Sequence, residues 1–355
     1  MNNNLELALD YPLGERLPER GSCIEILPGI KWIRMGLPFA LNHINLWLLR
    51  DTKDTPDGVV EGWSIVDCCI HKDESIAQWE SIFTNELDGL PVLRVIVTHM
   101  HPDHVGLADW LCQRWNAPLW MSGTDYQVAC AGSNATSTFA GDGGADFFAM
   151  HGLQDLAIVT QIRGRTRYFV SMVPAMPKHY HRMLDGMSLA IGNHRWRCIS
   201  GYGHAPEHIA LYCEDLKLLV AGDMMLPKIS TNVSVYEQEP EANALALFLD
   251  SIDKFRNLPA DTLTLPAHGK PFRGLHARID QLHAHHRDRL DEVLEACSAQ
   301  ACSAAEVLKV LFTRPLDAHQ TTFAMGESIA HLHWLWFAGA VRRTLGADGI
   351  YRFAA

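Results

Sequence analysis

Four residues that commonly bind metal ions lie within one stretch of six, which reads His99-Met100-His101-Pro102-Asp103-His104. The stretch directly follows the largely apolar run at residues 93–98. A strand that ends on such a loop delivers imidazoles and a carboxylate to one point on a rigid edge. Chance alone rarely produces this spacing, so the segment predicts a metal site at the end of a buried strand.

Three later turns repeat this arrangement with one ligand-type residue each. His204 follows the strand-like run 195–199, Asp223 ends the apolar run 218–221, and His268 ends the run 262–265. Glycine or proline stands beside each of them, as is usual where a strand closes on a turn. Each residue alone is more often an ordinary turn residue, but four such turns in this order indicate one shared metal site.

This order of motifs resembles the metallo-β-lactamase superfamily, whose signature is an H-x-H-x-D-H loop followed by a histidine, a bridging aspartate and a last histidine. The resemblance covers roughly residues 25–275 and implies an α/β fold, a four-layer αβ/βα sandwich. It also implies two metal ions bridged by Asp223. The implied ligands are His99, His101 and His204 for one ion, and Asp103, His104 and His268 for the other.

These donors are imidazoles and carboxylates without thiolates, a set that suits two Zn²⁺ ions per chain, with Mn²⁺ or iron as alternatives. Two such cations lower the pKa of a shared water and polarise a carbonyl or phosphoryl oxygen. The resemblance implies that Asp103 is also catalytic, orienting the nucleophile and handling its proton. A related redox branch has glutamate at the position of His101, so this histidine favours hydrolysis over redox chemistry.

Asp67 ends the strand-like run 63–67 and resembles the family's aspartate that orients a ligand histidine or the loop backbone without touching metal. Cys68 and Cys69 follow it, where the family usually has a small residue and glycine. Since seven better ligands already fill the implied sites, both cysteines are interpreted as buried or partly buried free thiols.

Residues 123–187 show no clear period, and the resemblance implies that a segment in this place covers the active site. The turn that carries His43, before an early strand, is expected to lie at the edge of the cleft. The loop after Asp223 carries Ser230 and Asn232, which could offer hydrogen-bond donors to an oxyanion. Each candidate has an ordinary alternative. The segment 123–187 could be a solvated lid, His43 a plain turn residue, and the polar side chains after Asp223 could form loop-capping hydrogen bonds. The candidate substrate contacts are His43, His179, Tyr180, His181, Ser230 and Asn232.

The pattern divides the chain into a catalytic domain at 1–275 and a C-terminal helical domain at 276–355. Strand-like runs at 24–27, 31–35, 44–49 and 63–68 indicate an antiparallel meander. Helical patterns follow at 74–87, with Asp73 as its N-cap, and at 105–115. The C-terminal domain is expected to contain helices at 275–296, 304–312 and 328–345, then a hairpin edge at 348–353.

This ending resembles the winged-helix-like appendage of the β-lactamase-like-protein-2 branch, on the segment Ala330-His331-Leu332. Some members of that branch cleave single-stranded RNA. Residues 276–355 contain eight Lys or Arg and nine Asp or Glu, a formal charge of -1, and the whole chain carries -11. A unit that reads nucleic acid is normally basic, so the appendage is expected to close the cleft or to form a subunit contact in a homo-oligomer.

The cluster His283, His285 and His286 is interpreted as a solvated helix face, because its spacing does not stack the rings at i and i+4. The chain is expected to be cytoplasmic, since its start lacks the basic and apolar regions of a signal peptide. No apolar run approaches the ~18 residues of a membrane span. Nine scattered cysteines do not suggest a disulfide framework.

The expected function is hydrolysis of an ester, thioester or lactone carbonyl by a metal-bound hydroxide. The substrate is expected to be a small molecule, with an anionic acyl thioester as the leading class. Two alternatives stay open. One is a single-stranded RNA endonuclease that uses the same metals, and the other is a ligand sensor that keeps the metal site with little turnover.

Overall fold

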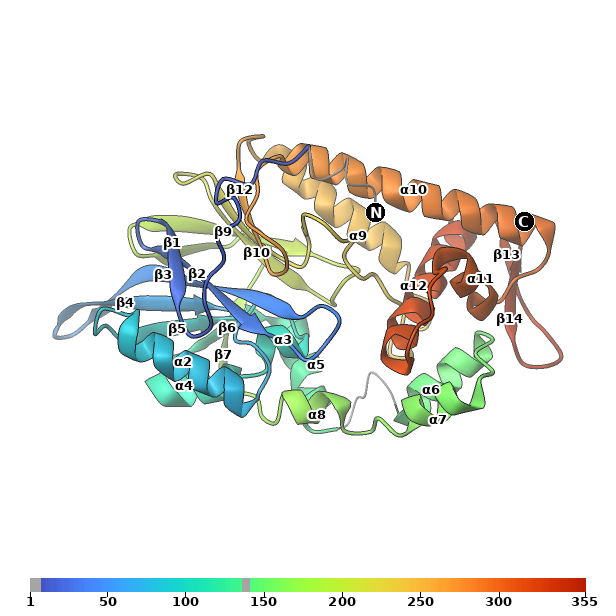
Figure 1. The fold of residues 1–355 in the computed structure, drawn as a ribbon, viewed down its shortest axis with the longest axis horizontal. Coiled ribbons are helices and arrows are strands. Elements are labelled where there is room, and N and C mark those ends of the chain that lie inside the picture. The colour runs from blue at the N-terminus through green and yellow to red at the C-terminus, as the bar shows by residue number, and fades with distance from the viewer. Residues whose placement is uncertain (1–7, 136–140) are drawn as a thin grey trace.

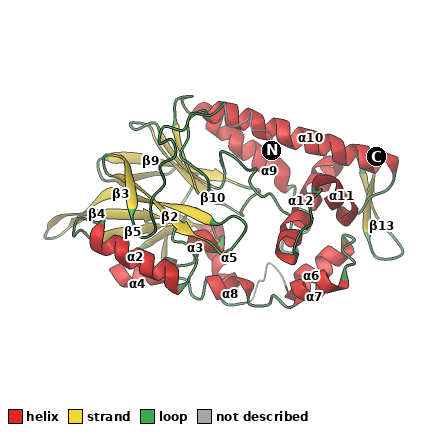
Figure 2. Ribbon diagram, in the orientation of Figure 1, coloured by secondary structure: helices red, strands yellow, loops and turns green. Residues whose placement is uncertain are grey.

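The computed structural model describes residues 8–135 and 141–355, and its two large sheets lie between layers of helices (Figures 1 and 2). Residues 1–7, and residues 136–140 of the predicted active-site cover, lie outside this part of the chain. The expected class, an α/β sandwich with a mainly helical C-terminal unit, is confirmed.

The first sheet contains seven strands in sequence order. Four of them pair antiparallel and match the predicted meander: β1 (Cys23–Leu27), β2 (Ile30–Gly36), β3 (His43–Thr55) and β4 (Gly58–Val66). Three parallel strands continue the sheet: β5 (Val92–Ile96), β6 (Leu119–Ser122) and β7 (Tyr180–Met183). Since parallel strands are covered on both faces, β5 is apolar at every position except Arg94.

The second sheet contains five strands in the order β12-β11-β10-β9-β8. Four neighbours pair antiparallel: β8 (Ser188–Ile191), β9 (His194–Gly201), β10 (His208–Cys213) and β11 (Leu218–Gly222). The last strand, β12 (Leu263–Pro266), runs parallel to β11. Consequently β11 and β12 end at the same edge, which places the residues that follow them close together.

The inner faces of the two sheets share one hydrophobic core. Trp47 and Ile65 of the first sheet belong to the same buried cluster as Trp196 and Leu211 of the second. Each buried tryptophan removes about 150–250 Å² from water, so this interface contributes much of the stabilisation of the sandwich. The sheets therefore form a rigid support for the loops at their ends.

Two helices cover the outer face of the first sheet, α2 (Asp73–Asn85) and α4 (Ala108–Trp115). The predicted cap of α2 is wrong, because Lys72 is the N-cap and Asp73 already lies in the first turn. The predicted helix 105–115 is divided into α3 (Pro102–Val105) and α4. Between them, Gly106 packs so closely on the backbone of Cys69 and Ile70 that a Cβ there would lie 2.6 Å from both.

The helices on the other side are α9 (Ala244–Asp253), continued by the short 3₁₀ helix η1 (Lys254–Asn257), and α10 (Leu275–Ala299). Phe248 of α9 and Leu282 of α10 pack with Ile199 and Leu219 of the second sheet in a second buried cluster. Figure 1 shows α9 and α10 side by side over this sheet.

The C-terminal unit adds α11 (Ala304–Leu311), α12 (Ala318–Phe337) and a hairpin of β13 (Arg342–Leu345) and β14 (Tyr351–Ala354). The predicted helix 328–345 has the wrong bounds. It begins ten residues earlier, because Asp317 and Gln320 form a reciprocal capping box, and its predicted end is β13.

The segment expected to cover the active site forms helices, although its sequence shows no clear period. Its helices are α5 (Gly123–Ser133), α6 (Gly141–Met150), α7 (Leu156–Arg163) and α8 (Tyr168–Met172). The segment then enters the first sheet as β7. Figure 1 places α6 and α7 beside the C-terminal helices and α8 nearer the first sheet.

Candidate metal centre

The four predicted ligand turns meet at one edge of the two sheets. Two groups of metal-binding atoms form there, and within each group the atoms lie within 4.8 Å of one another. The first group contains His99, His101, His204 and Asp223, and the second contains Asp103, His104 and His268. The structure thus brings together all seven residues that the sequence singled out, on the loop after β5 and just beyond β9, β11 and β12.

Three imidazole nitrogens of the first group face one another. The Nε2 atom of His99 lies 2.9 Å from Nδ1 of His101 and 3.2 Å from Nε2 of His204. The Nδ1 atom of His101 lies 3.1 Å from Nε2 of His204. Three ring nitrogens this close, each able to present a lone pair, are typical of the ligands of one ion.

Asp223 joins the two groups through its two carboxylate oxygens. Its Oδ2 lies 3.2 Å from Nε2 of His204, while its Oδ1 lies 3.5 Å from Nε2 of His104 and 3.4 Å from Nε2 of His268. Asp103 completes the second group, with Oδ2 3.4 Å from Nε2 of His268. Asp223 thus faces both groups, and its bridging role stays a prediction.

The donor atoms at this centre fit two divalent metal ions. Nε2 of His104 and Oδ1 of Asp223 are buried without a hydrogen-bond partner. Leaving such atoms unpaired costs about 1–3 kcal/mol each, which coordination to a cation would offset. The imidazole and carboxylate donors agree with zinc, and the identity and number of the ions stay a prediction.

Asp67 supports the ligand loop from behind. Its Oδ2 accepts a hydrogen bond of 2.8 Å from Nδ1 of His104, and its Oδ1 accepts one of 2.8 Å from the backbone N–H of Thr98. The residue adopts φ +64°, a left-handed conformation that turns the chain sharply after β4. Because Nδ1 of His104 donates to Asp67, Nε2 points toward the centre.

Two further ligand histidines are oriented by backbone carbonyls. Nδ1 of His204 donates to the carbonyl of Asn232, and Nδ1 of His268 donates to the carbonyl of His43, each over 2.7 Å. Both rings therefore present Nε2 to the centre. Asn232 and His43, expected as substrate contacts, thus act on the ligands through their backbone.

Burial and charge set the protonation of the ligands. Desolvation and the neighbouring histidines lower the pKa of His101 to about 3 and that of His99 well below its usual range. Burial opposes a charge on His268, but the carboxylates of Asp223 and Asp103 raise its pKa to about 10. Neutral His99 and His101 have the free lone pairs that metal binding requires, and a bound cation would displace the proton from His268.

Two buried residues near the centre were not anticipated. Asp125 of α5 accepts the backbone N–H of Met100 over 2.7 Å and that of Glu207 over 2.5 Å, so it ties together two ligand-bearing loops. His208 opens β10 and accepts the backbone N–H of Asp223 over 3.3 Å. Asp125 lies within α5 and His208 within β10, so their roles arise from the packing of these elements against the ligand loops.

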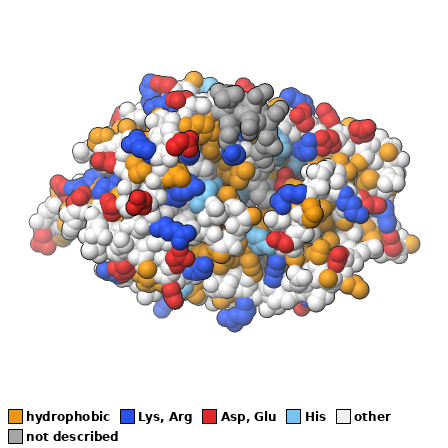
Figure 3. Space-filling view, in the orientation of Figure 1, with side chains coloured by type: hydrophobic (Ala, Val, Ile, Leu, Met, Phe, Trp, Pro, Cys, Tyr) orange, Lys and Arg blue, Asp and Glu red, His pale blue; other side chains and the backbone are white. Residues whose placement is uncertain are grey.

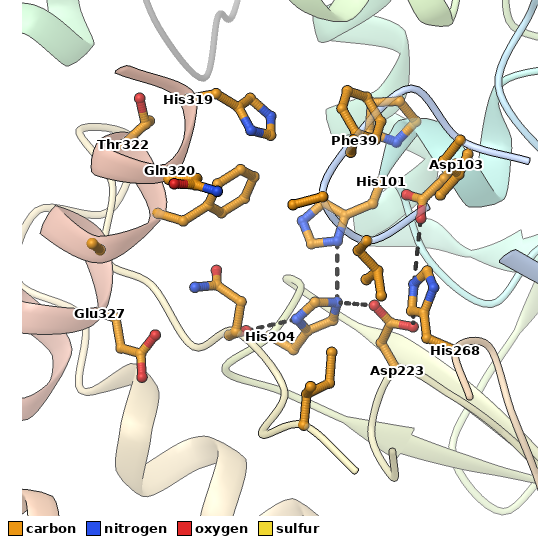
Figure 4. Close-up of a pocket in the computed structure, with 18 of the residues that line it drawn as sticks. Phe39, His101, Asp103, His204, Asp223, His268, His319, Gln320, Thr322 and Glu327 are labelled. Atoms are coloured by element: carbon orange, nitrogen blue, oxygen red, sulfur yellow. Dashed lines mark hydrogen bonds and ion pairs between the residues drawn. The ribbon is translucent and has the colours of Figure 1, made fainter. Parts of the chain in front are cut away.

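The metal centre opens into a cavity of about 350 Å³. His101, Asp103, His204, Asp223 and His268 line one side (Figure 4). The opposite wall comes from α12, where Figure 4 shows His319, Gln320, Thr322 and Glu327 facing the ligand residues across the space. The C-terminal unit therefore forms part of the cleft, one of the two roles expected for it.

The predicted substrate contacts divide into two sets. Ser230 and Asn232 line the cavity. His43 does not, since its Nε2 accepts the backbone N–H of Gly269 over 2.9 Å. His179, Tyr180 and His181 also lie away from the cavity lining, at the start of β7. Tyr180 stacks on Tyr126 and His181 on Trp120, because this stretch forms a sheet edge instead of a lid.

The cavity carboxylate of Glu327 provides a pH-dependent test of the structure. Burial raises its pKa to about 7, opposed by a hydrogen bond from Asn232. Because the folded state keeps the proton up to that pH and the unfolded chain releases it near pH 4.5, stability falls as pH rises from about 5 to 7. In Glu327→Gln this fall should be smaller by on the order of 1–3 kcal/mol, measured by urea unfolding at pH 5 and pH 8. The exposed Glu295→Gln serves as control, and an unchanged slope in Glu327→Gln would contradict a neutral carboxyl group at Glu327.

Two family models account for most of the chain. The model of the metallo-beta-lactamase superfamily matches residues 43–295, and that of the metallo-beta-lactamase-like C-terminal domain matches residues 290–355. The chain belongs to the metallo-beta-lactamase superfamily. The predicted family is thereby confirmed, while the narrower branch and the winged-helix description stay predictions.

Solved structures and curated relatives agree with this membership. A beta-lactamase domain protein from Burkholderia ambifaria is 50% identical, with a TM-score of 0.93 over 99% of each chain. A metallo-beta-lactamase family protein from Thermus thermophilus is 28% identical, with a TM-score of 0.75 over 93% of this chain and 99% of the other. The probable metallo-hydrolase YqjP of Bacillus subtilis (strain 168) is 22% identical over 330 residues, 90% of this chain and 96% of that relative.

The protein is accordingly a metal-dependent hydrolase of the metallo-beta-lactamase superfamily, which confirms the expected enzyme class. Within residues 8–135 and 141–355, no helix has the length and apolar character needed to span a membrane.

Proposed function

We propose that this enzyme hydrolyses an ester, thioester or lactone carbonyl of a small substrate, with acyl thioesters as the leading class. The proposal rests on one observation. The two groups of metal-binding residues open into one bounded, largely apolar cavity of about 350 Å³. A cavity of this size suits a small molecule. Among its lining residues, Leu37, Phe39, Met172 and Phe323 supply apolar surface for an acyl group.

The chain's own residues have separable roles in this reaction. Bound divalent ions would supply hydroxide near neutral pH and polarise the carbonyl oxygen. Asp103 lines the cavity next to His268, so its carboxylate is placed to orient the attacking water and to accept its proton. Ser230 and Asn232 line the same space and offer polar groups to the developing oxyanion. The apolar wall excludes bulk water and so strengthens these interactions.

Charge argues against a long RNA substrate. The C-terminal unit carries a formal charge of -1, and Lys or Arg side chains are intermixed with Asp and Glu on the face shown in Figure 3. Affinity for a phosphodiester chain normally rests on a continuous basic surface. A small substrate in the cavity needs only local cations.

Hydrolysis of acyl thioesters should require both metal and Asp103. Purified enzyme is expected to turn over a generic acyl thioester, to lose this activity in EDTA and to regain it with Zn²⁺ or Mn²⁺. Asp103→Asn should lower kcat by about 10²- to 10⁴-fold, the usual contribution of a positioned acid or base. The matched control is Asp109→Asn on α4, whose side chain accepts a hydrogen bond of 2.7 Å from the exposed Gln113.

The same proteins should be assayed on single-stranded RNA. Metal-dependent RNA cleavage without thioester, ester or lactone turnover would reverse the proposal in favour of an endonuclease. A metal-loaded protein that is inert on all four substrate classes, yet is stabilised by one metabolite in a thermal-shift assay, would instead indicate a sensor.

A further inference from the structure

Two arginines line the cavity and come from different parts of the chain. Arg165 lies between α7 and α8 in the cover segment, and Arg314 lies in the loop between α11 and α12. The lining also contains histidines, and its carboxyl groups are those of Asp103 and Asp223 of the metal centre and Glu327 of α12. The two guanidinium groups are thus the permanent cations of the described cavity wall.

Neither guanidinium forms a close ion pair with a carboxylate of the described residues, although Arg165 helps to lower the pKa of Asp317 at the start of α12. Nη1 of Arg165 donates to Oγ1 of Thr322 over 3.4 Å, and the group lies 5.9 Å from the ring centre of Tyr168. Nη1 of Arg314 donates to Oε1 of Gln320 over 3.0 Å. Within residues 8–135 and 141–355, no carboxylate lies within 4.0 Å of either group. Each guanidinium has five N–H donors, so most of them remain available to a ligand.

These contacts place both arginines on the side of the cavity opposite the metal centre. Thr322 and Gln320, their partners, stand on α12, and Figure 4 shows this helix across the space from Asp103 and Asp223. The remaining wall includes Phe39, which stacks on His319 at 5.2 Å between ring centres. A substrate in this space would therefore meet metal-ligand residues at one end and arginines at the other.

We propose that Arg165 and Arg314 bind an anionic group, a carboxylate or a phosphate, at the end of the substrate opposite the scissile carbonyl. This inference rests on the proposed hydrolysis of an acyl compound at the metal centre. The planar guanidinium fork matches carboxylate and phosphate oxygens, and such charge-assisted bonds strengthen beside apolar surface. The enzyme then selects substrates with an apolar body between a reactive carbonyl and a distant negative charge.

The reverse orientation is less favourable. In that orientation an apolar chain end would lie beside Arg165 and remove the hydration of the guanidinium without replacing it. The arrangement therefore specifies which end of the substrate approaches the metals. It also explains how a chain with a formal net charge of -11 can use an anionic substrate, because the attraction is local.

The test compares three acyl thioesters of equal length that end in a methyl group, a carboxylate or a phosphate. With the metal-loaded enzyme, kcat/KM for at least one anionic thioester should exceed that of the methyl compound by about 10- to 100-fold, the usual value of charge-assisted bonds. Arg165→Gln should reduce this ratio to about one to three, mainly through KM. Arg314→Gln should reduce it less, because Arg314 is exposed. The carboxylate and phosphate arms identify which anion is preferred.

Arg167→Gln is the matched control, since Arg167 is exposed, lies two residues from Arg165 and does not line the cavity. Its ratio should equal that of the parent enzyme. Metal-dependent turnover of all three thioesters at similar kcat/KM would overturn the anion site and leave the proposed hydrolysis intact. If none is hydrolysed, binding of the corresponding free dicarboxylate or phosphate would be measured by calorimetry. Binding by the parent enzyme that is lost in Arg165→Gln would support the anion site and contradict only the proposed hydrolysis.

Discussion

Asp223→Asn is expected to lower kcat by on the order of 10³-fold or more and to reduce the metal content to at most one ion per chain. The substitution keeps the shape of the side chain but removes the charge that faces both ligand groups, with Oδ2 toward His204 and Oδ1 toward His104 and His268. Those histidines hold the pKa of Asp223 well below its usual range although burial opposes ionisation, so the native group is a carboxylate. A two-metal site that loses its bridge loses the mutual positioning of nucleophile and carbonyl.

Metal content would be measured by elemental analysis after dialysis, beside steady-state kinetics and circular dichroism. Asp261→Asn is a suitable control, because Asp261 is an exposed partner of Lys217 and lies outside the cavity lining. Two tightly bound ions and near-native kcat in Asp223→Asn would show that this carboxylate does not bridge the metals.

The ligand turns could be predicted from sequence because each is a local feature. Each turn combines three features within a few residues: a short apolar run, a glycine or proline, and a histidine or aspartate. Gly222 and Asp223 are an example. The strands then need only to end at one edge, which the parallel pairing of β11 with β12 ensures. Asp67 could be identified on the same grounds, since it directly follows β4.

The opposite wall of the cavity could not be predicted in this way. Arg165 and Glu327 come from segments 162 positions apart in the sequence, and only the packing of α12 beside the cover segment places them in one cavity. The stretch at His179–His181 illustrates the reverse error. Its histidines and tyrosine suggested a binding loop, but pairing with β6 turns it into a sheet edge.

The start of α12 carries a capping signal that the apolar periodicity of the later turns outweighed in the prediction. Asp317 and Gln320 have the spacing of a capping box, and the structure contains both of its hydrogen bonds. The first two turns of the helix are polar, with Thr321 and Thr322 bonding back to carbonyls four residues earlier. The apolar period becomes clear only near Ile329, and a prediction that weighs periodicity above capping therefore begins the helix too late.

The C-terminal unit also supports the metal centre from outside. The loop after β11 carries Asn232, whose carbonyl holds His204, and Ser234, which packs on Gly326 of α12. A Cβ at Gly326 would lie 2.6 Å from that of Ser234, and the backbone N–H of Val235 donates to the carbonyl of Gly326 over 3.1 Å. Docking of this helix thus fixes the loop that orients a ligand histidine, which links the appendage to both the cavity wall and the metals.

Gly222→Ala is expected to destabilise the protein by about 2–5 kcal/mol, a large part of the stability of an ordinary domain. Gly222 adopts φ +52°, which costs an alanine about 1–2 kcal/mol. A Cβ there would also overlap Nε2 of His208 and approach Oγ1 of Thr98 to 3.3 Å. Both neighbours are fully buried beside the ligand loop and cannot move aside, so overpacking adds about 1–3 kcal/mol.

Gly186→Ala separates the two contributions, because Gly186 has φ +73° but nothing within 4 Å of a Cβ. Urea unfolding of the metal-free proteins should show a loss of about 1–2 kcal/mol for Gly186→Ala and at least twice that for Gly222→Ala, with a reduced soluble yield for the latter. Equal losses would mean that the strand end before Asp223 has room for a side chain. The close contact with His208 would then not be what fixes the bridging aspartate.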